Sequence, residues 1–376
     1  MKGMLGLISS LASFCFYTQG ASFDAFLEKV SNAIPQSATL NRRIQFELLT
    51  EVLLSEYSQA RLDRLAKGAH QYEAVAPILN NYASDPAKPV RREFRKGIIF
   101  MGDKQIRLES ALIRADSVPL FARPATNHVT VLSKGLLTDY RGFHSSASEL
   151  IGAEASIQAA SMDSVDLPMG LNRARFLNLV HSLTNIQFSE RLAVNGRGCI
   201  PVSATQVDSG DDYLITFDEI DFLPVAVKIS HDRMVTAEFL MGYSQHAKTG
   251  RKLSSEETVG YENGREVYRE RWDILSDERP AKIDQGQFKL DIPSDTLVNE
   301  YRYGAPFTYR RGYRPPTPEE MEKMSKDPKA VLAYELASKR HVVGMNSVWI
   351  FGAFLLLSLV LYSISRRRRT WPELSN

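Results

Sequence analysis

Seven histidines are the residues of this sequence that could bind a metal ion or transfer a proton near neutral pH. They stand apart, without the four-residue spacing or the neighbouring cysteines that zinc sites use. His181 falls on the apolar side of a predicted helix and is interpreted as a hydrogen-bonded core residue. The sequence therefore predicts no metal site. The seven are His70, His128, His144, His181, His231, His246 and His341.

Three short motifs resemble parts of catalytic or ion-binding sites. His144 precedes two serines, but adjacent residues do not form a triad; we interpret Ser145 or Ser146 as a helix cap, with Glu149 completing a capping box. The glycines of "VNGRGC" lack the spacing of a phosphate-binding loop and indicate a turn. Asp208, Asp211 and Asp212 could bind calcium, yet they lack EF-hand spacing, so a solvated loop is favoured. The sequence thus predicts a protein that is not an enzyme and uses no cofactor.

Apolar and aromatic residues that recur with period two form the remaining candidate site. Such alternation is typical of strands with one buried face. The ordinary interpretation is a core between sheet and helices; the functional one is a groove for an apolar ligand. Trp272 alternates with Arg271 and Asp273, so it is expected to point to the apolar side. The candidate cavity residues are Phe100, Leu108, Phe217, Phe239, Tyr268, Trp272 and Phe288.

The elements that would position these residues change character at Pro89. Before it, apolar residues at helical spacing predict helices over residues 23–34, 39–66 and 70–82. After it, alternation predicts hairpins that turn at Gly102–Asp103, Asp232–Arg233 and Asn263–Gly264, and a closing strand through Phe288 to Ile292. Residues 146–160 and 170–184 return to helical spacing. The predicted fold class is α+β, with a curved antiparallel sheet and helices on one side.

An apolar run near the C-terminus predicts a membrane helix over residues 343–365. No charged residue lies between Val348 and Ile364, and the uncharged stretch approaches the ~20 residues that span a bilayer core. Trp349 and Tyr362 stand near its two ends, where interfacial aromatic residues are typical. Four arginines follow and predict a cytoplasmic tail over 366–376 by the positive-inside rule; they are Arg366, Arg367, Arg368 and Arg369. A buried hairpin helix and a sorting signal that is cleaved after export are the alternatives, although no Pro-Glu-Pro motif precedes the run.

The N-terminus predicts a secretory signal over residues 1–21. Lys2 precedes an apolar segment that is short for a membrane span, and small residues follow it. An uncleaved signal anchor is the alternative. Cleavage would remove Cys15 and leave Cys199 as a free thiol. With the cytoplasmic tail, this places the large domain outside the cytoplasm, in a bacterial cell envelope; the absence of an Asn-x-Ser/Thr sequon fits that location.

Composition limits the partners and the organisation of the chain. The formal net charge is +2, and no basic stripe apart from the tail suggests nucleic acid. The middle of the chain divides into a helical section (22–88), a sheet domain (89–300) and a Pro/Tyr/Arg-rich and helical stalk (301–342). The stalk helix is expected to be interrupted at Pro328 and to run towards the membrane.

Three stretches of the sheet domain carry a resemblance to a known family. They are "FRKGIIFMGDKQIRLES", "DEIDFLPVAVKISHDRMVTAEFLMGY" and "GQFKLDIPSDTLVNE". Their order, over residues 92–309, resembles the LolA/LolB-like lipoprotein-carrier superfamily of periplasmic proteins. The resemblance implies a curved antiparallel half-barrel, helices over its mouth, and a hydrophobic cavity for acyl chains. The helical front section and the C-terminal anchor depart from soluble carriers.

Two functions follow from these observations. The first is a membrane-tethered binding protein that holds a lipid or a lipid-modified partner such as a lipoprotein. The second is a structural or assembly protein that uses the sheet to dock envelope proteins. A cavity large enough for an acyl chain favours the first, and a filled interior favours the second.

Overall fold

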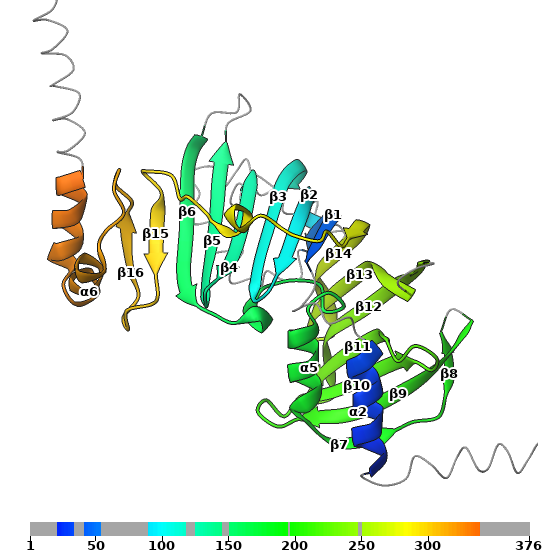
Figure 1. Cartoon of the computed structure of the whole chain (residues 1–376). Helices are drawn as coiled ribbons and strands as arrows, with labels where there is room; N and C mark the ends of the chain where they lie inside the picture. The colour runs from blue at the N-terminus through cyan, green and yellow to red at the C-terminus, as the bar shows by residue number, and fades with distance from the viewer. Residues whose placement is uncertain are drawn as a thin grey trace, which may run out of the picture. The chain divides into compact units, whose positions relative to one another are not determined.

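The computed structural model describes residues 21–33, 41–53, 89–117, 125–144, 150–194, 196–246 and 250–338. They form a mostly β structure with a curved, open sheet and few helices (Figure 1). The chain divides into two compact units. Unit 1 comprises residues 1–151 and 159–290, and unit 2 comprises residues 152–158 and 291–376.

The sheet of unit 1 follows the order β5-β4-β3-β2-β1-β14-β13-β12-β11-β10-β9-β7, and β8 also pairs with β9. Its neighbouring strands run antiparallel. The strands are β1 (Arg42–Leu53), β2 (Pro89–Gly102), β3 (Gln105–Ser117), β4 (Asn127–Ser133), β5 (Leu136–His144), β7 (Leu183–Phe188), β8 (Leu192–Val194), β9 (Arg197–Gln206), β10 (Asp212–Asp218), β11 (Pro224–His231), β12 (Met234–His246), β13 (Gly250–Glu262) and β14 (Arg265–Glu278).

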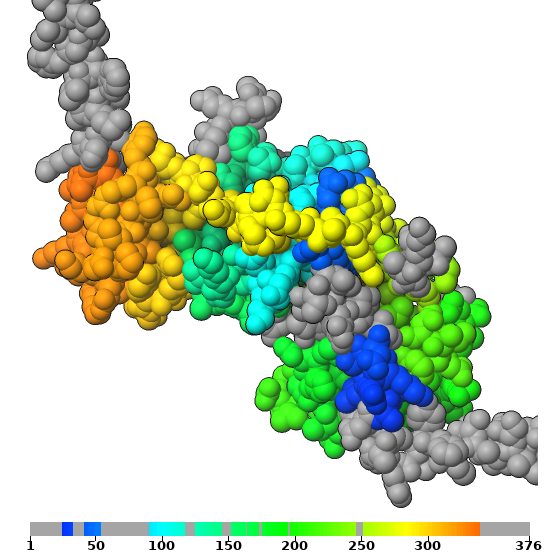
Figure 2. Space-filling model, viewed as in Figure 1, coloured from blue at the N-terminus to red at the C-terminus, as the bar shows by residue number. Residues whose placement is uncertain are grey.

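Two helices of unit 1 bury their apolar sides against one face of the sheet. They are α2 (Ala21–Ala33), which confirms the helix expected over 23–34, and α5 (Arg173–His181), which is shorter than the one expected over 170–184. Phe26 of α2 meets Phe217 of β10 edge to face, with ring centroids 5.1 Å apart. Figure 2 shows α2 in blue against the green part of the chain, to which α5 and β10 belong. We call the face under these helices the inner face.

The hairpin turns predicted at Asp232–Arg233 and Asn263–Gly264 are confirmed, and the one expected at Gly102–Asp103 lies one residue further along, at Asp103–Lys104. Asn263 and Gly264 have φ angles of 52° and 74°, and Asp232 and Arg233 have φ angles of 49° and 65°. Positive φ at both central residues is the geometry of a two-residue type I′ turn, which asparagine, aspartate and glycine adopt at little cost. Local sequence therefore fixes where β11 passes into β12 and where β13 passes into β14.

The helix expected over residues 39–66 is wrong within residues 42–53, which form strand β1. Ile44, Leu48 and Val52 recur every four residues, and a spacing of four fits one side of a strand as well as one side of a helix. The strand prevails because β1 hydrogen-bonds with β2 on one edge and with β14 on the other. The helix expected over residues 70–82 lies outside the described residues.

Two further expectations are corrected. The helix expected over 146–160 is wrong within residues 150–159, which form strand β6 (Leu150–Ala159), and the cap expected at Ser145 or Ser146 lies outside the described residues. The closing strand through Phe288 is also wrong. A 3-10 helix, η5 (Gln285–Phe288), stands there, and the next strand begins only at Leu297.

Unit 2 holds most of β6, together with β15 (Leu297–Glu300), β16 (Phe307–Arg310) and α6 (Pro318–Lys326). β15 runs parallel to β6 and antiparallel to β16. Residues 328–338 form a second helix after a break at Asp327, which confirms the interruption expected at Pro328. Tyr334 on this second helix packs edge to face on Tyr309, with centroids 5.8 Å apart.

The expected membrane segments lie outside the described residues. This applies to most of the signal and to the whole anchor and tail, including Trp349, Tyr362 and Arg366–Arg369. None of the helices that the structure describes is long and apolar enough to cross a membrane. The anchor and the signal remain predictions of the sequence.

Candidate functional site

Strand register sorts the seven candidate cavity residues onto two faces of the sheet. Residues directly opposite each other on paired strands share a face, and every second residue along a strand does so too. Leu48 of β1 lies opposite Trp272 of β14 and opposite Arg95 of β2, so all three share the inner face. The same rule places Leu108, Phe217, Phe239, Tyr268 and Trp272 on the inner face.

Phe100 and Phe288 lie on the opposite, outer face. Phe100 alternates with the inner residues Ile99 and Met101. The ring of Phe288 lies where a Cβ at Gly102 would meet it at 3.1 Å, so η5 rests on the outer side of β2. Arg107 of β3 holds the same segment by donating to the carbonyl oxygens of Gln287 at 3.1 Å and of Lys289. The candidate residues therefore do not line one common surface.

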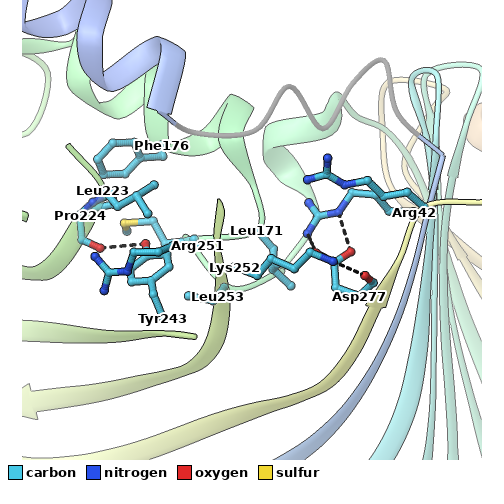
Figure 3. Close-up of a pocket in the computed structure, with 13 residues that line it drawn as sticks. Arg42, Leu171, Phe176, Leu223, Pro224, Tyr243, Arg251, Lys252, Leu253 and Asp277 are labelled. Carbon is cyan, nitrogen blue, oxygen red and sulfur yellow. Dashed lines mark hydrogen bonds and ion pairs between the residues drawn. The ribbon is translucent and has the colours of Figure 1, made fainter. Parts of the chain in front are cut away.

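The inner face under α5 is filled by side chains. Phe217 contacts Phe176 of α5 in addition to Phe26. The space that remains beside α5 has a volume of about 20 Å³ (Figure 3). That volume suits about one water molecule and is too small for an acyl chain. Its walls are tied together, because Tyr243 donates to the carbonyl of Pro224 at 2.8 Å.

A larger hollow is lined by the outer side of β9–β13 and has a volume of about 580 Å³. Its wall carries an ion cluster in which Arg197 and Arg251 both contact the carboxylate of Asp218, at 2.6 and 2.8 Å. Burial opposes ionisation of Asp218, but these hydrogen bonds and those from the backbone outweigh it and lower the pKa. Cys199 lines the same hollow. The charged wall suits polar groups and does not suit an acyl chain.

Trp272 lies at the centre of the inner face, on the apolar side as expected. It is 5% exposed and packs on Phe46, with ring centroids 4.6 Å apart. Its indole N–H donates to Glu270 at 2.5 Å, and the Tyr268 hydroxyl donates to the same carboxylate. Burial raises the pKa of Glu270 despite these two hydrogen bonds.

The inner face of β1–β5 changes from apolar to polar along its strands. At one end, seven apolar side chains are buried; they are Ile44, Ile99, Met101, Ile106, Leu108, Leu132 and Leu137. Further along β2–β5, the side chains on the same face are polar. They are Arg95, Ser110, His128, Thr130 and Asp139. We call these five the polar row. The seven apolar side chains belong to the same packed core as the residues under α5, and the polar row borders this core.

Arg95 and Ser110 are the members of the polar row whose bonding is incomplete. The Arg95 guanidinium donates to Glu93 at 2.9 Å and to the carbonyl of Ala125 at 2.7 Å. Its Nη1 atom and the Ser110 hydroxyl are buried without a hydrogen-bond partner in the described part of the chain. Sequence analysis missed Arg95 because it placed Phe100, on the other side of β2, among the cavity residues. An arginine in phase with Ile99 and Met101 was the available signal.

The other polar-row residues form a closed network. Asp139 accepts from Thr130 at 2.7 Å and from His128. Burial opposes ionisation of Asp139, but these hydrogen bonds prevail and lower the pKa. Ser110 lies directly opposite His128, yet its hydroxyl makes no hydrogen bond to the imidazole, so the group lacks the nucleophile–base contact of a triad.

The remaining chemistry-bearing residues of the sequence do not gather into a site. Asp211 pairs with His231 at 2.8 Å in a surface turn. His181 is exposed, so its interpretation as a core residue is wrong. Within the described residues, no group of three or more His, Cys, Asp and Glu side chains is placed to hold a metal ion.

Comparison with known proteins finds similarity among solved structures. No protein-family model and no curated protein matches it. Among solved structures, a putative outer membrane lipoprotein-sorting protein domain from Vibrio parahaemolyticus aligns at 7% identity and a TM-score of 0.37, over 70% of this chain and 94% of that one. A LolA superfamily protein from Nitrosomonas europaea aligns at 8% identity and a TM-score of 0.37, over 71% of this chain and 97% of that one. The second of these carries the superfamily name that the sequence resemblance also gave.

A third structure is more distant. LprF from Mycobacterium bovis aligns at 10% identity and a TM-score of 0.25, over 71% of this chain and 97% of that one. Similarity at this level concerns the fold and does not extend to ligands or partners.

Proposed function

We propose that this protein is a membrane-tethered, extracytoplasmic binding protein that holds a lipid or a lipid-modified partner against the inner face of β1–β5. The observation that carries the proposal is the change along this face from seven buried apolar side chains to the polar row. An acyl chain on these apolar side chains would gain ~0.8 kcal/mol per CH₂ removed from water. The predicted signal and anchor place the large domain outside the cytoplasm and the tail after residue 365 in the cytoplasm. The domain boundaries are those predicted from the sequence.

The part of the inner face beside α5 is filled and offers no room for a lipid. With about 20 Å³ free, that part serves as core, and a docking surface for envelope proteins would have to lie elsewhere. The two functions differ in one measurable property, which is whether a lipid chain reaches β1–β5.

A photoreactive fatty acid tests the proposal on the full chain, purified from membranes and transferred to amphipol. We expect saturable labelling at micromolar concentrations, with labelled peptides drawn from β1–β5 around Ile99, Leu108 and Leu132. Retained native lipids should appear by mass spectrometry of the same preparation. A protein that carries no lipid and takes up no label at tens of micromolar contradicts lipid binding, and the docking function then leads.

A further inference from the structure

Arg95 shares its carboxylate partner with a second arginine on the inner face. Glu93 is 3% exposed and is shared between Arg91 and Arg95, so one carboxylate serves two guanidinium groups. Glu270, which shares the inner face on β14, is already hydrogen-bonded by Tyr268 and Trp272. A buried N–H donor without an acceptor is costly, and an arriving acidic group would remove that cost.

One nitrogen of Arg95 and the hydroxyl of Ser110 have no hydrogen-bond partner in the described chain. The Nε and Nη2 atoms of Arg95 are engaged with Glu93 and Ala125, which leaves the buried Nη1. The Ser110 hydroxyl, on a residue that is 5% exposed, is another buried polar atom without a partner in the described chain. The two residues are diagonal neighbours on the inner face, because Arg95 lies opposite Leu112 and Gly97 lies opposite Ser110. Gly97 carries no side chain, and the ring of Phe46 fills the space above it.

From this geometry we infer that Arg95 and Ser110 bind the acidic group, a carboxylate or a phosphate, of the amphipathic ligand. The inference rests on the proposed function and names the class of ligand: an acidic lipid with its chain along Leu108 and Ile99 and its acidic group at Arg95. Arginine Nη1 would donate to one oxygen and the Ser110 hydroxyl to the same or the second oxygen. Charge-assisted hydrogen bonds of this kind are stronger than neutral ones.

Three probes separate the acidic group from the chain. They are palmitate, its methyl ester and inorganic phosphate, each competing against the photoreactive fatty acid on the full chain. We expect palmitate to compete at least tenfold better than the ester, and phosphate alone not to compete. Equal competition by palmitate and ester would overturn the inference while leaving lipid binding intact. Competition by phosphate at the same concentration would assign the site to a free anion and also overturn it.

Substitutions locate the preference. Arg95→Gln should remove the preference for acid over ester, and Ser110→Ala should weaken it severalfold. Arg95→Gln leaves Glu93 with Arg91 as its partner, so the single variant keeps a neutral pair. The double variant Glu93→Gln/Arg95→Gln leaves Arg91 unpaired, and it shows whether a positive charge without the Arg95 donors is enough for the preference. Arg114→Gln, at an exposed outer-face arginine paired with Asp116, is the matched control. A double variant that retains the tenfold preference contradicts the assignment.

Discussion

The carboxylate of Glu256 on β13 accepts a hydrogen bond from the backbone N–H of Met169, 2.6 Å away. It accepts a second from the N–H of Gly170 at 2.9 Å. Glu256 is 2% exposed and lies on the inner face opposite Trp272. One side chain thus fastens the segment before α5 to the sheet.

Glu256 should make unit 1 less stable as the pH rises. Burial raises its pKa to about 7, despite the hydrogen bonds from Gly170 and Met169. A carboxyl whose folded pKa lies above its unfolded value of about 4.5 stabilises the fold fully below pH 4.5, and this contribution is lost as the pH rises through 7. The loss between pH 5 and pH 8 should reach ~3 kcal/mol, read from urea unfolding at each pH.

Glu256→Gln should flatten that pH dependence, because an amide does not ionise in this pH range. Glu257→Gln, one residue along on the outer face, is the control and should leave the slope unchanged. A Glu256→Gln variant with the slope of the parent protein would show that another group is responsible.

Gly97 should tolerate no side chain. A Cβ there would collide with the ring of Phe46 and the backbone carbonyl of Glu109. Overpacking of this kind costs ~1–3 kcal/mol, so Gly97→Ala should lower the thermal midpoint of unfolding. The control is Gly260→Ala, whose Cβ would meet Tyr268 at an ordinary 3.5 Å. Equal midpoints for the two variants would contradict the close approach of Phe46.

Cys199 should be unreactive in the folded protein. It is a free cysteine, 1% exposed, and burial raises the pKa of its thiol. Since the thiolate is the reactive form, a chromogenic disulfide reagent should react slowly before denaturation and at once afterwards. The number of thiols after denaturation also tests the signal: one is expected if Cys15 has been removed, and two if it is retained.

Trp272 should report ligand binding on the inner face. In a Trp349→Phe/Trp371→Phe background, it is the remaining tryptophan, and its burial against Phe46 predicts blue-shifted emission. An acidic lipid bound at Arg95 lies one strand from Phe46, so emission should change with the same concentration dependence as photolabelling. Saturable labelling without any change in emission would show that the ligand binds away from Trp272 and the centre of the sheet.

The predicted topology can be tested at Asn376. A reporter that is active only in the cytoplasm should be active when fused there, and one that is active only in the periplasm should be inactive. The reason is that four arginines follow the apolar run. A protease added to the outer side should degrade the large domain and leave the tail. Periplasmic activity of the reporter would reverse the topology, and a mature protein that ends before Val348 would indicate cleavage.

The sequence by itself determined the features that depend on neighbours along the chain. The turns at Asn263–Gly264 and Asp232–Arg233 follow from which residues tolerate positive φ. The helix Ala21–Ala33 follows from apolar residues at helical spacing, and the alternation around Trp272 identified its buried side.

Only the tertiary structure decided the features that depend on distant partners. Residues 42–53 became a strand because β2 and β14 offer hydrogen bonds on both edges, a fact that their own four-residue spacing cannot express. The register with β1 decides which side of β2 faces inward. Arg95 lies on that inner side, whereas Phe100 lies on the outer side. Arg95 and Ser110 are diagonal neighbours because of the register between β2 and β3. That register determines the side chains that share a face across neighbouring strands.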